Sequence, residues 1–169
     1  MYAVKKLSQK TIQIESTDIQ VIEVQKRACK IKWLTRFLKS YKSNVGTINE
    51  EHIGARAKFL IAMMGNRQLG FVRLTNKSHH FVGLSETWCL SDLYVKPPYR
   101  HQGIGTKLSA VAISDYQTKL ACLDQHLLES QRNHYRALGF TTYIVGQRSQ
   151  LCWLYHRTMP DHNIRSKLL

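Results

Sequence analysis

The segment that most constrains the fold is residues 93–106, LYVKPPYRHQGIGT, where an apolar run meets two prolines and a glycine turn. Residues 93–95 are typical of a strand, which the prolines cannot continue. Gly103 and Gly105 suit a tight turn, and the apolar spacing behind them predicts a helix over residues 103–119. A strand that leads into a helix through such a turn places bare backbone N–H groups where a phosphate can bind.

Apolar periodicity predicts the other elements. Strands are expected at 11–15, 59–64, 69–74, 87–95, 120–123, 141–145 and 151–155. Basic amphipathic helices, one long or two in succession, are expected over 19–42, and another helix over 129–138, closed by Gly139. The strand, helix and strand around the glycine turn should form a parallel crossover. We therefore expect one α/β domain over residues 1–160, a twisted mixed sheet of about six to seven strands with helices on both faces, and a basic tail over 161–169.

Charge and composition limit the partners. The chain has 25 Lys and Arg against 11 Asp and Glu, a net charge of +14. Such an excess attracts a phosphorylated cofactor, an acidic protein or nucleic acid, although a basic surface with no dedicated partner explains it equally well. No apolar run reaches the roughly 20 residues of a membrane span, so we expect no membrane contact. The four cysteines lack Cys-x-x-Cys spacing, which favours buried free thiols, Cys89 included, over a nucleophile, a disulfide or a metal site. Free thiols are typical of a reducing compartment, so we expect a cytoplasmic protein.

The pattern Val95-x-Pro97-x-x-Arg100-x-x-Gly103-x-Gly105 resembles the acetyl-CoA signature of the GNAT superfamily of N-acetyltransferases. The resemblance implies a GNAT-like fold in which the glycine turn holds the diphosphate of coenzyme A and the preceding strand pairs with the pantetheine arm. The implied cofactor-binding residues are Leu93, Tyr94, Val95, Arg100, His101, Gln102, Gly103, Ile104, Gly105 and Thr106. His101 stands where the family often has glycine. Lys107 is expected to add positive charge to this site.

A second motif, Tyr135-x-x-x-Gly139-Phe140, resembles the end of a later helix of the same family. The resemblance implies that Tyr135 is the general acid for the departing thiolate, since a phenol with a pKa of about 10 can donate a proton at neutral pH. Alternatively, Tyr135 packs a helix end as a core aromatic. Leu128 and Gln131 stand where the family often has Asn and Ala, so the resemblance supplies no Asn contact to the cofactor.

Two carboxylates are candidates for the general base, and the sequence does not choose between them. Family members commonly use a carboxylate, often through water, and a backbone N–H of the strand before the glycine turn stabilises the carbonyl oxygen. The candidates are Glu86 and Asp92, which share a face with Leu90 if that strand is regular. Asp92 could instead bind neighbouring backbone or an Arg. His79 and His80, in the preceding loop, are further candidates.

The resemblance implies an N-acetyltransferase that moves the acetyl group of acetyl-CoA to an amine. The acceptor is left open among an acidic protein, an aminoacyl-RNA and a small molecule, and a homodimer is compatible with the sequence. The alternative is a catalytically weak acetyl-CoA-binding or nucleic-acid-binding regulatory module on the same fold. The bases of a bound nucleic acid would then stack on the aromatic residues Trp33, Phe37, Tyr41 and Trp153. A cofactor sensor that regulates a partner is a third possibility.

Overall fold

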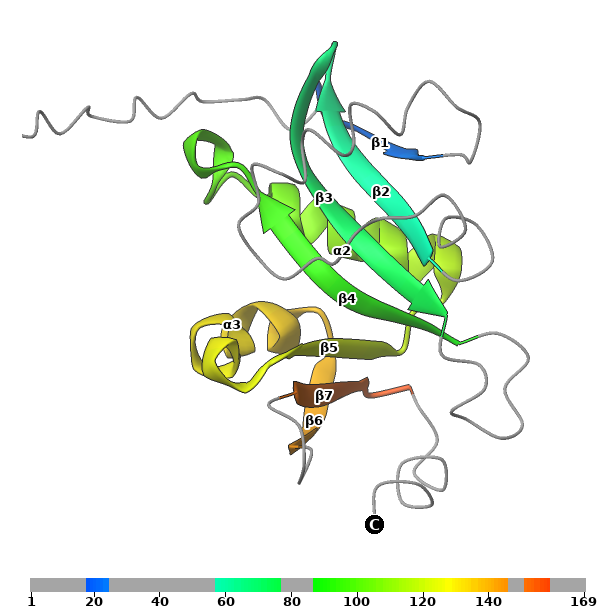
Figure 1. Cartoon of the computed structure of the whole chain (residues 1–169), viewed down its shortest axis with the longest axis vertical. Helices are drawn as coiled ribbons and strands as arrows, with labels where there is room; N and C mark the ends of the chain where they lie inside the picture. The colour runs from blue at the N-terminus through cyan, green and yellow to red at the C-terminus, as the bar shows by residue number, and fades with distance from the viewer. Residues whose placement is uncertain (1–17, 25–56, 77–86, 146–150, 159–169) are drawn as a thin grey trace, which may run out of the picture.

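The computed structural model describes residues 18–24, 57–76, 87–145 and 151–158. They form a seven-stranded mixed sheet with the order β1-β2-β3-β4-β5-β7-β6 (Figure 1). The strands are β1 (Gln20–Glu23), β2 (Ala57–Met64), β3 (Arg67–Asn76), β4 (Trp88–Val95), β5 (Leu120–Asp124), β6 (Phe140–Val145) and β7 (Leu151–His156). The helices in this part of the chain are the 3₁₀ turn η4 (Pro97–Tyr99) and the α-helices α2 (Ile104–Tyr116) and α3 (Gln125–Ala137). The predicted mixed sheet is confirmed.

The sheet consists of two antiparallel parts joined by one parallel pair. Strands β1, β2, β3 and β4 pair antiparallel with one another in that order, and β7 pairs antiparallel with both β5 and β6. Strand β4 pairs parallel with β5, and α2 forms the crossover between them, as predicted. Helix α3 begins directly after β5, four residues earlier than the predicted start at 129.

The prediction is wrong at the start of the chain's first expected helix. Residues 20–23 form β1, which pairs antiparallel with β2 through Val21↔Ala62 and Ile22↔Ile61. Val21 and Ile22 pack on opposite faces of the sheet, as consecutive β-branched residues of a strand do. Helix α2 holds this strand through a hydrogen bond from the Tyr116 hydroxyl to the Glu23 carboxylate. The rest of the predicted helix, the strand at 11–15 and the tail at 161–169 lie outside the described residues.

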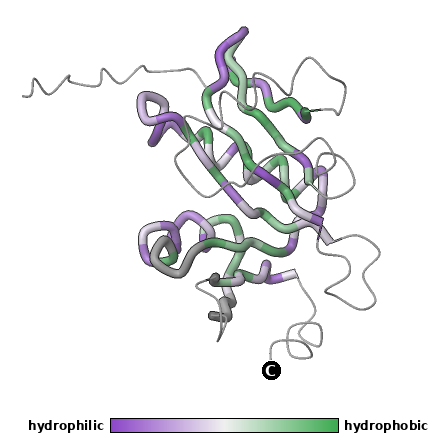
Figure 2. Tube along the Cα trace, viewed as in Figure 1, coloured by the Kyte–Doolittle hydropathy of each residue, from purple (hydrophilic) through white to green (hydrophobic). Residues whose placement is uncertain are grey.

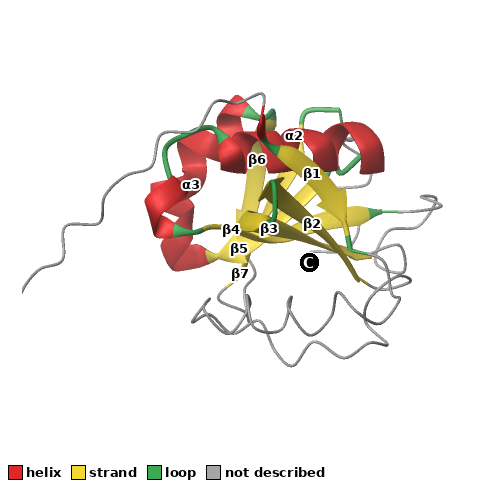
Figure 3. Ribbon diagram, turned by 90° about the horizontal axis from the view of Figure 1, so that it is seen from above, coloured by secondary structure: helices red, strands yellow, loops and turns green. Residues whose placement is uncertain are grey.

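The two faces of the sheet carry separate apolar clusters, and β2 and β5 are mainly hydrophobic (Figure 2). Helix α2 lies along one face (Figure 3), where Ile104 and Leu108 are fully buried. Leu128 of α3 belongs to the same cluster, so both described α-helices cover one face. On the opposite face Phe59 and Phe71 form a tilted aromatic pair with ring centroids 6.1 Å apart. The prediction of helices on both faces is thus confirmed for one face by the described residues, and residues 25–42 of the predicted helical segment lie outside them.

Strand β4 contains a β-bulge at Ser91. Arg73 pairs with Asp92, but the next residue, Leu74, pairs with Leu90, so Ser91 is an extra residue. Leu90 therefore packs on the face covered by α2, whereas Asp92 shares the opposite face with Arg73. The expected common face of Leu90 and Asp92 is wrong, because the extra residue resets the alternation of the strand.

The three cysteines of the described residues agree largely with expectation, and Cys29 lies outside those residues. Cys89 and Cys152 are buried free thiols, and Cys122 is a free thiol that is only half-buried. In the described ranges, no group of three His, Cys, Asp or Glu side chains is arranged to hold a metal ion. No helix of those ranges combines the length and hydrophobicity needed to cross a bilayer.

Candidate functional site

Strands β4 and β5 diverge in the middle of the sheet. Their ladder consists of Cys89↔Leu120 and Leu90↔Ala121 and ends where the bulge at Ser91 begins. Strand β4 stays paired with β3 as far as Gly70↔Val95, so only its other edge loses its ladder partner over residues 91–95 (Figure 1). Because an extended ligand can add to such an edge through its backbone groups, these residues form the first half of the candidate site.

The second half is the predicted glycine turn. The backbone is left-handed at His101 (φ 62°) and at Gly103 (φ 74°), which is the N-cap of α2. The amide of Lys107 donates the helix's first hydrogen bond, to the carbonyl of Gly103 at 2.9 Å, and no side chain caps the helix. The N–H groups of residues 104–106 thus lack helical acceptors, and they form the positive end of the helix dipole. The Ile104 side chain is buried, so that residue can offer a ligand only its amide.

The space over this turn is open enough for a phosphate. A Cβ placed on Gly103 would meet no atom within 4 Å. His101, Gly103 and Thr106 are exposed. An open, uncapped helix N-terminus beside a strand edge that has left its ladder with β5 matches the two chemical parts of coenzyme A, an anionic diphosphate and an extended amide-containing arm. The residues present therefore fit that cofactor.

The two predicted cationic side chains behave differently. Arg100 donates from Nε to the carbonyl of Val95 at 2.9 Å, and its guanidinium lies 5.8 Å from the ring centroid of Tyr94. These contacts hold the charge of Arg100 beside the turn. The Lys107 ammonium instead donates to the Ile19 carbonyl at 2.6 Å, which ties α2 to the residue before β1. The expected contribution of Lys107 to a phosphate site is therefore not supported.

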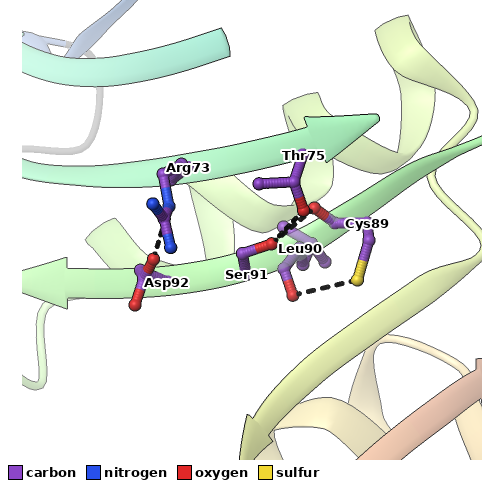
Figure 4. Close-up of polar contacts among 6 residues, drawn as sticks. All are labelled: Arg73, Thr75, Cys89, Leu90, Ser91 and Asp92. Atoms are coloured by element: carbon purple, nitrogen blue, oxygen red, sulfur yellow. Dashed lines mark hydrogen bonds and ion pairs between the residues drawn. The ribbon is translucent and has the colours of Figure 1, made fainter. Parts of the chain in front are cut away.

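Polar side chains gather at the bulge, on the face opposite α2 (Figure 4). Arg73 Nε lies 2.7 Å from Asp92 Oδ2, and both side chains are largely buried. The Ser91 hydroxyl hydrogen-bonds with that of Thr75 and donates to the Cys89 carbonyl at 3.4 Å. Asp92 is thus bound to an Arg, the structural alternative anticipated for it. Nothing in the sequence spacing signals Arg73, because the contact depends on the register between β3 and β4.

Tyr135 lies near the end of α3, and its side chain is 3% exposed. It packs edge-on against Phe140 and His134, at centroid distances of 5.8 Å and 5.4 Å. This is the packing of a core aromatic, and its role as a general acid stays a prediction. Gly139 follows the helix with φ 95°, in agreement with the predicted left-handed cap.

One residue of the site had no sequence signal. His134 of α3 reaches toward the first turn of α2, where its Cε1 lies 3.9 Å from the position of a Cβ on Gly105. Burial lowers the pKa of its imidazole. Three other candidates, Glu86, His79 and His80, lie outside the described residues, so their geometry is not addressed.

A family profile described as "Acetyltransferase (GNAT) domain" matches residues 55–142. The chain belongs to the GNAT acetyltransferase family. It is therefore an acyltransferase that uses acetyl-CoA and acts on amine acceptors. The matched residues run from just before β2 into β6 and include the bulge, the glycine turn and α3.

Solved structures show the same fold at low sequence identity. An aminoglycoside acetyltransferase, meta-AAC0020, from an uncultured soil metagenomic sample and in complex with sisomicin, is 16% identical with a TM-score of 0.57, covering 72% of this chain and 87% of its own. Arabidopsis thaliana Naa50, in complex with the bisubstrate analogue CoA-Ac-MVNAL, is also 16% identical with a TM-score of 0.57, covering 81% and 96%. A search of curated proteins gave no match.

Proposed function

We propose that this enzyme binds the cofactor between β4, β5 and the first turn of α2, and transfers the acetyl group to an amine that approaches the bulge at Ser91. One observation carries this proposal. The β4–β5 ladder ends at Leu90, and β4 then runs on through the glycine turn to the uncapped N-terminus of α2. Bound acetyl-CoA supplies an activated thioester carbonyl. The remaining requirements fall on the side chains and backbone of this protein.

Binding is assigned to two groups of residues. The amides of residues 104–106 would hold the diphosphate, with Arg100 adding a full positive charge beside them. His101 and Gln102 complete the turn that precedes these amides. The edge of β4 over residues 93–95 would pair with the pantetheine arm. Backbone N–H groups at the bulge are suited to donate to the thioester carbonyl oxygen, because a bulge turns such groups out of the ladder.

Two proton transfers complete the proposed mechanism. The acceptor amine must lose a proton before it attacks, and Glu86 and Asp92 are the candidate bases. The 2.7 Å contact between Arg73 and Asp92 favours a structural role for Asp92 and leaves Glu86 as our choice. Tyr135 would then donate a proton to the departing sulfur.

The choice of base can be tested by comparing Glu86→Gln with Asp92→Asn. We expect Glu86→Gln to flatten the acidic limb of the kcat/KM profile against pH, and Asp92→Asn to lower mainly the melting temperature. The reverse ranking would transfer the role of base to Asp92. Affinity for coenzyme A, measured calorimetrically for both variants, controls for an indirect effect on the cofactor.

For the acceptor, we propose an amine on an anionic molecule, either an acidic protein or an RNA. The net charge of +14 supports this choice, because a positive surface repels polycationic amines. The similar structures carry acceptors of different kinds, with sisomicin in one and a peptide-containing analogue in another, so the fold alone does not select among them.

The acceptor proposal is tested by measuring thiol release from acetyl-CoA with polyamines, acidic peptides and aminoacyl-RNA. Turnover with an anionic acceptor, with a KM that rises with salt, is the expected result. Preferred turnover of polyamines would contradict the proposal. Tight, salt-dependent RNA binding without thiol release would support the regulatory module instead.

A further inference from the structure

His134 connects α3 with the first turn of α2. The Cβ position on Gly105 that lies 3.9 Å from His134 Cε1 also lies 3.7 Å from Leu93 Cδ2 and 3.8 Å from Val95 Cγ2. The imidazole and two side chains from the end of β4 thus surround the same point beside the first turn of α2. Both segments belong to the candidate cofactor site, whereas His134 itself has no assigned role.

The polar character of His134 has no explanation within the described fold. Its Nε2 is buried and has no hydrogen-bond partner among the residues that the structure describes. A buried nitrogen without a partner costs free energy that an apolar side chain would not cost. Burial also lowers the pKa of the imidazole, so that the ring is neutral and one of its nitrogens is a hydrogen-bond donor.

The geometry points to the diphosphate of coenzyme A as the missing partner. We propose that His134 is a cofactor-binding residue whose Nε2–H donates a hydrogen bond to a diphosphate oxygen. The amide of Gly105 is one of the uncapped N–H groups of α2, so an oxygen bound there lies close to the imidazole. The side chain as a whole is only partly buried, and rotation of its ring can present Nε2 to that oxygen. This inference rests on the cofactor placement proposed above.

The position of His134 in α3 agrees with such a role. In the family resemblance, α3 contributes an Asn to the cofactor, but the corresponding residue here, Leu128, is buried in the apolar core. His134 lies six residues further along α3, and its Cε1 is among the three atoms nearest to a Cβ on Gly105. A single imidazole would thus supply the polar contact from α3 that Leu128 cannot make.

The test compares His134→Leu and His134→Gln in binding coenzyme A and pantetheine, which has the thiol arm but no diphosphate. For His134→Leu we expect an unchanged or higher melting temperature, a loss of affinity for coenzyme A of roughly tenfold or more, and unchanged affinity for pantetheine. His134→Gln keeps a donor and should recover part of the affinity. His156→Leu is the matched control, since burial also lowers the pKa of His156, which lies on β7, and it should bind coenzyme A like the wild type.

Several outcomes would overturn the proposal. His134→Leu could bind coenzyme A as the wild type does, or lose affinity for both ligands equally, and either result removes the diphosphate contact. If the variants do not fold, the ¹⁵N signals of His134 in the wild type still decide, because coenzyme A but not pantetheine should shift Nε2. A wild-type protein that binds no coenzyme A would refute the proposed function, and with it this inference. Wild-type binding without an effect at His134 would refute the inference alone.

Discussion

Replacing Gly103 with Ala separates the folding role of the glycine turn from its binding role. The added methyl group meets no atom within 4 Å outside the neighbouring residues, so the substitution causes no clash with the rest of the described fold. The backbone there is left-handed, with φ 74°. An L-residue in that conformation costs about 1–2 kcal/mol, and the less flexible unfolded chain offsets about 0.4–1 kcal/mol of it. The net loss of stability should be about 1 kcal/mol, or roughly 2–4 °C in Tm for a chain of this size.

Gly103→Ala should reduce the free energy of cofactor binding by more than it reduces the free energy of unfolding. The methyl group would take up part of the open space at the turn, beside the amides of residues 104–106 that are proposed to hold the diphosphate. Losing one hydrogen bond to a charged group costs about 1.5–3 kcal/mol, so affinity for coenzyme A should fall by roughly ten- to a hundredfold. Titration calorimetry with coenzyme A, together with thermal unfolding of the same samples, measures both quantities.

Gly65→Ala is the matched control for this experiment. Gly65, in the turn between β2 and β3, also has a positive φ of 54° and open space around its Cβ position. The two variants should lose similar stability, but only Gly103→Ala should lose affinity. If Gly103→Ala binds coenzyme A as tightly as Gly65→Ala does, the amides after Gly103 do not hold the diphosphate, and the proposed placement is wrong.

Three further perturbations test other parts of the structure. His101→Gly should raise Tm by about 1–3 °C, because glycine relieves the left-handed backbone at φ 62°; a lower Tm would argue against strain there. Tyr135→Phe should lower kcat about a hundredfold while affinity for coenzyme A stays unchanged, and an unaltered kcat would remove Tyr135 from the mechanism. Burial lowers the pKa of His134 and His156, so the unfolded chain takes up protons first as the pH falls, and stability should decrease below the unfolded-state pKa of about 6.5. Urea unfolding at pH 8 and pH 5.5 checks this, and a slope unaltered in His134→Leu would contradict the assignment to that residue.

Local chemistry made much of the fold predictable from sequence. The glycine turn, the parallel crossover and the cap at Gly139 each depend on residues that are close together in the chain, and each is confirmed. The sequence predicts a helix where β1 forms, because apolar residues three or four positions apart also occur in a strand that packs on both faces.

The details of the site were less predictable, because they depend on contacts between distant segments. The bulge at Ser91 follows from how β3 and β4 align, and no periodicity within β4 alone marks it. The Arg73–Asp92 ion pair depends on the same alignment. The proximity of His134 to Gly105 depends on how two helices and a strand meet, which residue spacing cannot specify.

The short ladder between β4 and β5 has a mechanical consequence. In the described part of the chain, the rungs Cys89↔Leu120 and Leu90↔Ala121 are the backbone pairing that joins the two antiparallel halves of the sheet. Beyond these rungs the two strands share no ladder, although the apolar cluster under α2 includes side chains from both halves. A cofactor bound between β4 and β5, as proposed, would supply hydrogen bonds that the strands do not make to each other. Cofactor binding would thus strengthen the junction between the two halves of the sheet.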